Sequence, residues 1–142
     1  MKRLWLLLLY KVPPEPTSHR VYVWRKLKRL GAVLLHDTVW CLPITGWTRE
    51  QFQWLSVEIK EFGGNAMVFE SELILPGQDE TLIQQFLTEV DIGYAEILKE
   101  LEKVEVDLMS LSKQYQQIYK KDYFQSELGT QVRQALMSDR ER

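Results

Sequence analysis

The chain has 142 residues, a net charge of −2 and an apolar fraction of 45%. This composition is typical of a globular protein with a core of its own and excludes low-complexity and disordered classes. The charge is uneven, because residues 1–31 hold eight Lys/Arg and one acid, whereas residues 79–107 hold two Lys and nine acids. Such a split favours binding of polyanions at one end or pairing with a second copy, and it is equally typical of two solvated faces.

The first predicted element is a strand at the N-terminus. The run Leu4–Tyr10 is continuously apolar, but it ends after seven residues at Lys11 and no small-residue cleavage site follows. It is too short for a membrane span and lacks the pattern of a signal peptide, so we expect a buried strand of a cytoplasmic protein. A helix follows, which we expect to be capped by Thr17 or Ser18 and ended by Gly31.

This helix has two unlike faces at about 100° per residue. One face is apolar and is predicted to lie on a sheet: Val23, Trp24, Leu27 and Leu30. The other face carries cations: Arg25, Lys28 and Arg29. Arg20 breaks the pattern because it stands in the first turn on the apolar side, where a charge needs a carboxylate, a carbonyl or a bound anion.

The following elements complete a predicted α+β domain over residues 1–78. They are a hairpin over 32–42, a helix that opens at the capping box Thr48-Arg49-Glu50-Gln51 and ends at Gly63-Gly64, and a strand over 66–75. The order strand, helix, strand, strand, helix, strand is that of the ferredoxin-like βαββαβ unit. We therefore expect an antiparallel sheet with both helices on one face.

Residues 79–142 are predicted to form a long helical, coiled-coil-like C-terminal extension. Apolar residues recur every three or four positions from Ile83 to Ile118, which is a heptad seam of about five repeats. As one straight helix this segment would be about 54 Å long, longer than the first domain can cover. We therefore expect either a homodimer or a sharp fold-back near Val104–Asp107, followed by a last helix near residues 123–137 that Asp122 caps.

Side chains able to carry metal or covalent chemistry are sparse. His19 and His36 lie seventeen residues apart, and Cys41 is the only cysteine, which excludes an internal disulfide and predicts a buried, inert thiol. No metal-binding spacing, phosphate-binding glycine motif, catalytic triad or pair of catalytic carboxylates stands out. We therefore expect no metal, no cofactor and no enzymatic activity.

Anion binding is the chemistry that remains. Lys11 ends the first strand, and Ser18 and Arg20 open the following helix, where free N–H groups and the positive end of the helix dipole favour an oxyanion. These three residues form the candidate oxyanion site. The structural alternative is that the helix start is merely capped and that Arg20 pairs internally, for example with Glu70 or Glu72.

A second candidate is a nucleic-acid site on the basic face of the same helix. Arg25, Lys28 and Arg29 point away from the predicted core and are suited to contact phosphates of DNA or RNA. The chain lacks the aromatic pattern of an RNA-recognition sheet and shows no helix-turn-helix. An ordinary solvated basic face is an equal alternative.

Several motifs resemble the N-terminal domain of the chromate-resistance protein ChrB. They are Trp5-Leu6-Leu7-Leu8, Arg20-Val21-Tyr22-Val23-Trp24-Arg25-Lys26-Leu27, Leu30-Gly31-Ala32, Val39-Trp40-Cys41-Leu42-Pro43, Gly63-Gly64-Asn65-Ala66 and Asp122-Tyr123-Phe124. The resemblance implies a bacterial regulatory module of the chromate response. More distantly, the pattern is similar to PaaX-type repressors and to small CRISPR adaptation nucleases. Those nucleases have an aspartate at the end of the first strand, where this chain has Tyr10-Lys11-Val12, so we do not expect nuclease activity.

Together these features predict a cytoplasmic, non-enzymatic module that takes part in the response to chromate or another oxyanion. Two alternatives stay open. The first is a nucleic-acid-binding module that uses the basic helix, which salt-dependent binding to DNA or RNA would favour. The second is a purely structural dimerisation module, which a stable homodimer without ligand or nucleic-acid affinity would favour. No membrane association is expected.

Overall fold

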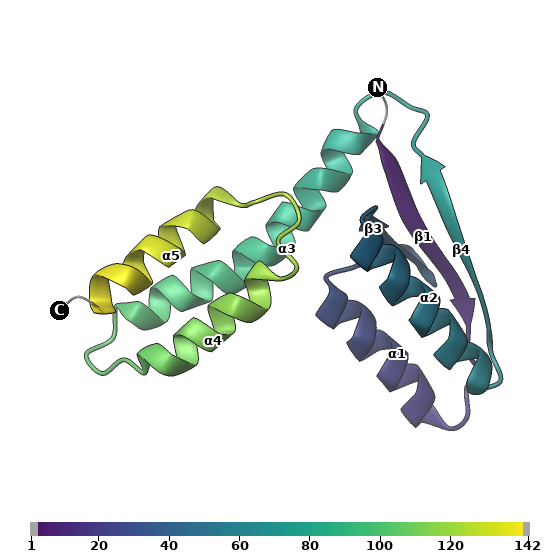
Figure 1. Cartoon of the computed structure of the whole chain (residues 1–142), viewed down its shortest axis with the longest axis horizontal. Coiled ribbons are helices and arrows are strands. Elements are labelled where there is room, and N and C mark those ends of the chain that lie inside the picture. The colour runs from purple at the N-terminus through teal and green to yellow at the C-terminus, as the bar shows by residue number, and fades with distance from the viewer. Residues whose placement is uncertain (1–2, 141–142) are drawn as a thin grey trace. The chain divides into compact units, whose positions relative to one another are not determined.

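The computed structural model describes residues 3–140 of the chain. The chain divides into two compact units, Met1–Glu80 and Thr81–Arg142. Within the described residues, four strands form one antiparallel sheet and five helices accompany them, so the protein is of the mixed α+β class (Figure 1). None of the helices between residues 3 and 140 is long and apolar enough to cross a membrane.

The sheet belongs entirely to the first unit. Its strands are β1 (Leu4–Lys11), β2 (Val33–His36), β3 (Val39–Pro43) and β4 (Asn65–Glu72), in the spatial order β2-β3-β1-β4. Every neighbouring pair is antiparallel. The central strand β1 places Leu7 opposite Cys41 of β3 and opposite Phe69 of β4. The apolar run at the N-terminus is therefore a central strand, with neighbours on both sides.

Two helices, α1 (Thr17–Leu30) and α2 (Gly46–Glu61), lie on one face of this sheet. Successive side chains of a strand point to opposite faces, so Tyr10 of β1 and Glu70 of β4 share a face. Arg20 of α1 acts electrostatically on Tyr10, and Arg49 of α2 bonds Glu70. The core between the helices and the sheet is made of fully buried side chains: Leu6, Leu8, Val23, Leu27, Leu42, Phe52, Leu55 and Ile59.

The ends of α1 differ in how well the sequence predicted them. Gly31 ends the helix in the left-handed conformation, with φ of 78°, and its N–H bonds the Lys28 carbonyl, as expected. The predicted cap by Thr17 or Ser18 is wrong. Pro16 takes the N-cap position with extended backbone, and no side chain accepts a hydrogen bond there. The first turn of α1 therefore keeps its backbone N–H groups without a side-chain cap.

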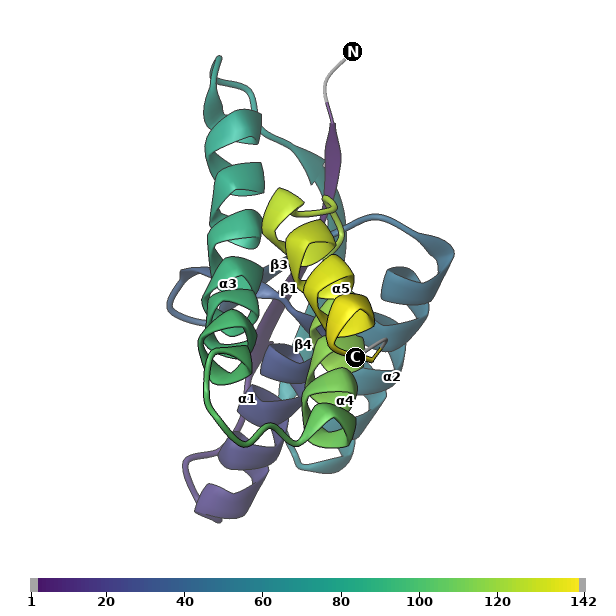
Figure 2. The same cartoon turned by 90° about the vertical axis from the view of Figure 1, so that its left-hand side faces the viewer.

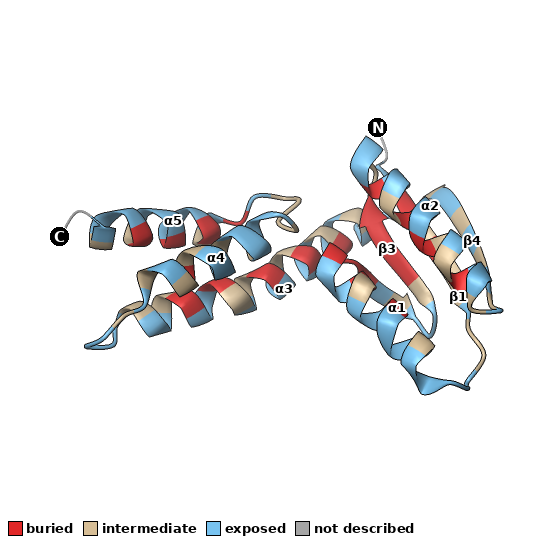
Figure 3. Cartoon of the chain, turned by 60° about the horizontal axis from the view of Figure 1, so that its bottom comes forward, coloured by how far each residue is buried: buried red, intermediate tan, exposed pale blue. Residues whose placement is uncertain are grey.

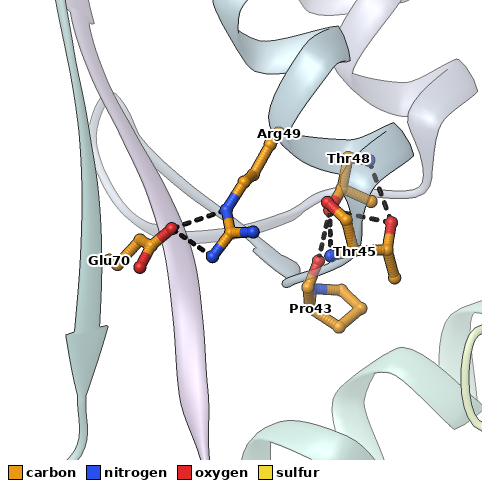
Figure 4. A network of polar contacts seen from close by, with 5 residues as sticks. All are labelled: Pro43, Thr45, Thr48, Arg49 and Glu70. Atoms are coloured by element: carbon orange, nitrogen blue, oxygen red, sulfur yellow. Dashed lines mark hydrogen bonds and ion pairs between the residues drawn. The ribbon is translucent and has the colours of Figure 1, made fainter.

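The start of α2 also differs from the prediction. The capping box is formed by Thr45 and Thr48, three residues upstream of the one expected, and the helix begins at Gly46. Thr48 is fully buried, and its hydroxyl donates a hydrogen bond of 2.7 Å to the carbonyl of Pro43 at the end of β3 (Figure 4). This bond ties the start of α2 to the sheet, which is why the helix starts at the earlier threonine.

The second unit is a bundle of three helices around one core. Its helices are α3 (Gln78–Leu101), whose first residues belong to the first unit, α4 (Leu108–Tyr119) and α5 (Glu127–Arg140). Figures 1 and 2 show α4 and α5 lying along α3, and Figure 3 shows buried residues on their facing sides. The core consists of Val90, Tyr94, Ile97, Leu111, Val132 and Leu136.

The heptad seam is divided between two helices. A continuous helix from Ile83 to Ile118 does not form, because α3 ends at Leu101 and α4 begins at Leu108. Of the two expected forms, the structure shows the fold-back near Val104–Asp107. The Asp107 side chain caps α4 by accepting a hydrogen bond from the Ser110 N–H. The final helix starts later than predicted, at Glu127.

Candidate anion-binding site

A hollow of about 710 Å³ opens in the first unit between the end of β1 and the outer side of α1. Lys11 and Tyr10 contribute to it from β1, and Arg20, Trp24 and Arg25 contribute from α1. The first turns of the helix and the last residues of the strand come together because the connection between them is short and rich in proline. Residues from two elements therefore form a single concave surface.

Three cations line this hollow: Lys11, Arg20 and Arg25. Within residues 3–140, none of the three pairs with a carboxylate, and all three are exposed. Like charges gathered in one concavity repel one another, and a bound anion relieves that repulsion. Arginine adds geometric selectivity because its planar guanidinium offers two parallel donors to an oxyanion.

Arg20 does not form the internal ion pair with Glu70 that was the alternative to an anion site. Glu70, one of its two suggested partners, is bonded by Arg49, whose Nε and Nη2 lie 2.6 and 2.5 Å from Glu70 Oε1 (Figure 4). Arg20 instead projects into the hollow next to Tyr10. The internal pairing of Arg20 with Glu70 is therefore wrong.

Tyr10 lines the hollow from the end of β1. Burial raises the pKa of the Tyr10 phenol above its usual value, whereas a side-chain hydrogen bond with Trp40 and the positive charge of Arg20 act in the opposite direction. Tyr10 therefore adds an uncharged polar side chain to the hollow at neutral pH. Tyr10 was not among the predicted site residues, although its place directly before Lys11 at the end of a predicted strand was an available signal.

The hollow includes Lys11 and Arg20 of the predicted oxyanion site but not Ser18. Ser18 is exposed in the first turn of α1, and the neighbouring Thr17 lines the hollow instead. The reason is helical spacing, because residues 17, 20, 21 and 24 share one side of α1. Trp24 belongs to that stripe. It was expected in the core, but it is 52% exposed and forms part of the wall.

The basic face predicted for nucleic acid is displayed on α1. Arg25, Lys28 and Arg29 are all exposed. Arg25 is shared with the hollow, and Lys28 Nζ lies 5.9 Å from the centroid of the Trp24 ring. The exposed cations of α1 and the hollow are therefore adjacent parts of one basic surface.

Cys41 and the two histidines are not among the side chains that line the hollow. No cluster of three His, Cys, Asp or Glu able to hold a metal ion exists in residues 3–140. Cys41 is fully buried, and burial raises the pKa of its thiol to about 12, which keeps it protonated and unreactive. His19 stacks on Phe62 with ring centroids 4.0 Å apart. The hollow is therefore lined by cationic and hydroxyl groups.

Comparison with known families identifies the chain. The family model described as "Protein ChrB, N-terminal" matches residues 20–109, which is well over half of the sequence. The match begins at Arg20 in α1 and continues through β2, β3, α2, β4 and α3 into the start of α4, so that β1 precedes it. No curated protein matches the chain in sequence. The family match confirms the resemblance found in the sequence, and the chain belongs to the ChrB N-terminal family.

Proposed function

We propose that this protein is a non-enzymatic regulatory module of the chromate-resistance response and that its hollow binds an oxyanion such as chromate. The family match supports a regulator-like domain. The main support for an anionic ligand is that Lys11, Arg20 and Arg25 line one hollow, with no carboxylate paired to them in residues 3–140. A tetrahedral dianion is the ligand class that neutralises such a group most directly.

The backbone adds to this chemistry. The first turn of α1 lacks a side-chain cap, and the His19 N–H bonds the Pro16 carbonyl, so the other N–H groups of that turn and the positive end of the helix dipole remain for an anion beside Thr17. Tyr10 and Thr17 add uncharged polar side chains to the lining. The proposed binding mode thus combines two guanidinium groups, an ammonium group and uncharged donors around one anion. Reversible binding of this kind suits a cytoplasmic sensor.

We also propose that the first unit is a ferredoxin-like domain and that α3 and α4 pack in a coiled-coil-like hairpin. The strand order β2-β3-β1-β4 and the placement of both helices on one face support the first assignment. The coiled-coil-like hairpin is supported by core side chains that recur every three or four residues within each helix. They are Val90, Tyr94, Ile97 and Leu101 in α3, and Leu108, Leu111, Tyr115 and Ile118 in α4.

The oxyanion proposal is tested by thermal unfolding of the whole chain. Sodium chromate and sodium sulfate are titrated against sodium chloride of equal ionic strength. A ligand of the native state raises the unfolding free energy by RT ln(1 + [L]/Kd), about 2.7 kcal/mol at a hundred times Kd. We expect a saturable rise in the wild type, its loss in Arg20→Ala, and its retention in the matched control Arg29→Ala.

Two results would contradict the oxyanion proposal. One is a rise that is unsaturable and equal in wild type and Arg20→Ala, which is general salt stabilisation. The other is an Arg20→Ala protein that loses stability equally with and without the anion. Because Arg20 is exposed, we expect the substitution to leave the fold intact.

Nucleic-acid binding is the second candidate function, favoured by the continuity of the hollow with the exposed cations of α1. Three residues of this face, with neighbouring cations, predict about three to five phosphate contacts per chain, or a slope of log affinity against log salt of roughly −2.7 to −4.5. Replacement of Arg25, Lys28 and Arg29 by Glu should abolish this binding without unfolding the protein. An anisotropy titration at low salt with duplex DNA, single-stranded DNA and RNA decides between this function and a solvated face.

A further inference from the structure

The two edges of the sheet are protected very differently. β2 forms one edge, has four residues, and its pairing with β3 shifts register between Leu34 and His36. β4 forms the other edge, has eight residues, and pairs with β1 in unbroken register from Asn65 to Glu72. Figure 1 shows β4 running along the outer side of β1. The β4 edge is therefore long and regular, whereas the β2 edge is short and irregular.

A long regular edge is a template for another strand, because alternate N–H and C=O groups point away from the sheet without a ladder partner. Proteins usually block such an edge with charged side chains, above all lysine, or with a proline, a bulge or a short strand. The β4 sequence Asn-Ala-Met-Val-Phe-Glu-Ser-Glu contains neither lysine nor proline, and its register shows no bulge. Its first glutamate, Glu70, is neutralised by Arg49 of the same unit (Figure 4).

Beside this edge lies a row of exposed apolar side chains. Met67 is 57% exposed and Phe69 is 43% exposed. They stand opposite Leu9 and Leu7 of β1, on the sheet face away from α1 and α2. Exposed methionine and phenylalanine on an unpaired edge are the side chains that pairing with a further strand would bury.

We infer that β4 pairs with the β4 strand of a second copy of this chain, antiparallel and about a two-fold axis at Val68. In this register Met67 of each copy faces Phe69 of the other, and Glu70 faces Ala66. Moving the axis to Glu70 would set Glu70 against Glu70, a like-charge pair that destabilises a sheet. The strand is thus complementary to itself, which selects a second copy as the partner and gives an isologous dimer with one continuous sheet.

Sedimentation velocity of the whole chain over a range of concentrations tests this inference. We expect the wild type to approach twice the monomer mass as concentration rises. Met67→Lys places a charge in the apolar row and should weaken self-association at least about tenfold, because a lysine on an edge opposes pairing. The matched control is Leu34→Lys, on the opposite edge at 48% exposure, which should dimerise like the wild type.

A wild type that stays monomeric at every concentration would overturn the inference, as would a Met67→Lys protein that dimerises unchanged. Disulfide formation provides a second readout that does not depend on the lysine variant. Met67→Cys and Phe69→Cys chains, mixed under a mild oxidant, should form a mixed disulfide, while the buried Cys41 thiol does not take part. Disulfides between two Phe69→Cys chains alone would refute the register. The inference stands independently of oxyanion binding, which none of these substitutions touches.

Discussion

The hollow of the first unit and the polar cluster around Tyr94 in the second unit differ in how their polar groups are paired. In the first unit, Lys11, Arg20 and Arg25 surround a hollow without a carboxylate paired to them in the described residues. In the second unit, the Tyr94 hydroxyl donates to Asp122 at 2.9 Å, although Tyr94 is fully buried. Buried polar groups that find partners fix a fold, whereas charges gathered without partners indicate a binding surface. The contrast supports the proposal that the anion-binding function lies in the first unit.

The polar network of the second unit also explains the Asp-Tyr-Phe triplet before α5. Asp122 accepts hydrogen bonds from Tyr94 and from the Ser126 N–H, and the Ser126 hydroxyl bonds Asp91 of α3. Tyr123 and Phe124 pack against Phe86, with ring centroids 6.2 and 5.6 Å apart. The triplet thus fastens the segment before α5 to α3, which is a structural role.

The largest expected effect comes from a charge placed in the helical core. Ile97 is fully buried in the cluster of the second unit, so Ile97→Asp should cost at least about 3 kcal/mol of unfolding free energy, because a buried carboxylate lacks a partner there. Ile92→Asp, on the same helix at 56% exposure, is the matched control and should be nearly neutral. Urea unfolding measures both. Equal losses in the two variants would show that the second unit lacks the core described.

The next largest loss of stability is expected from a substitution at Gly129, which lies against the Tyr94 ring. A Cβ atom at Gly129 would lie 2.8 Å from ring atoms of Tyr94, so Gly129→Ala should destabilise the protein by about 1–3 kcal/mol through overpacking. Gly46→Ala in the first unit is the control, since nothing lies within 4 Å of the added atom. Thermal unfolding of the two variants checks this contrast, and a stable Gly129→Ala protein would contradict the close packing of α5 on α3.

Tyr94→Phe removes the hydroxyl while keeping the ring. At neutral pH it should cost about 0.5–1.5 kcal/mol, the net value of a hydrogen bond. Burial, and then the bond to Asp122, raise the pKa of Tyr94, so the folded chain keeps the phenolic proton when the unfolded chain loses it above about pH 10. Stability should therefore fall as pH rises above this value, less steeply in Tyr94→Phe. Identical alkaline slopes in urea titrations would refute this.

The smallest effect is expected from the surface pair of the first unit. Arg49 and Glu70 are both substantially exposed, with side-chain exposures of 47% and 43%. Arg49→Ala should therefore change the unfolding free energy by no more than about 1 kcal/mol. A double-mutant cycle with Glu70→Ala measures the coupling between the two side chains. A coupling of several kcal/mol would mean that the pair is a structural support comparable with the Tyr94 network.

Periodicity and turn residues predicted much of the fold. The strand at the N-terminus and the helix stop at Gly31 follow from local patterns, because apolar spacing and glycine conformation act over a few residues. The fold-back near Val104–Asp107 was one of two expected forms, and the packing of α3, α4 and α5 around one core selects it. The start of α2 did not follow. Thr45 and Thr48 both fit a cap, and the bond from Thr48 to the Pro43 carbonyl, which depends on the sheet, selects the earlier start.

The site was predictable only in part. Lys11 and Arg20 stand where a strand ends and a helix begins, so the sequence brings them close. The pairing of Arg49 with Glu70, which takes away one suggested partner of Arg20, joins residues twenty-one positions apart, and no local pattern encodes it. Trp24 lies at the margin of the apolar arc, where helical spacing alone does not decide between core and cavity wall.

Direct binding of chromate to the whole chain tests the central claim most directly. Equilibrium dialysis at constant ionic strength should show one saturable class of chromate site that sulfate displaces and that Arg29→Ala retains. The same experiment on Arg20→Ala should show binding reduced at least about tenfold, because an arginine contact to an oxyanion contributes about 1.5–3 kcal/mol. Saturable binding that is unchanged in Arg20→Ala, or no saturable binding by the wild type, would contradict the assignment of the hollow as an oxyanion site.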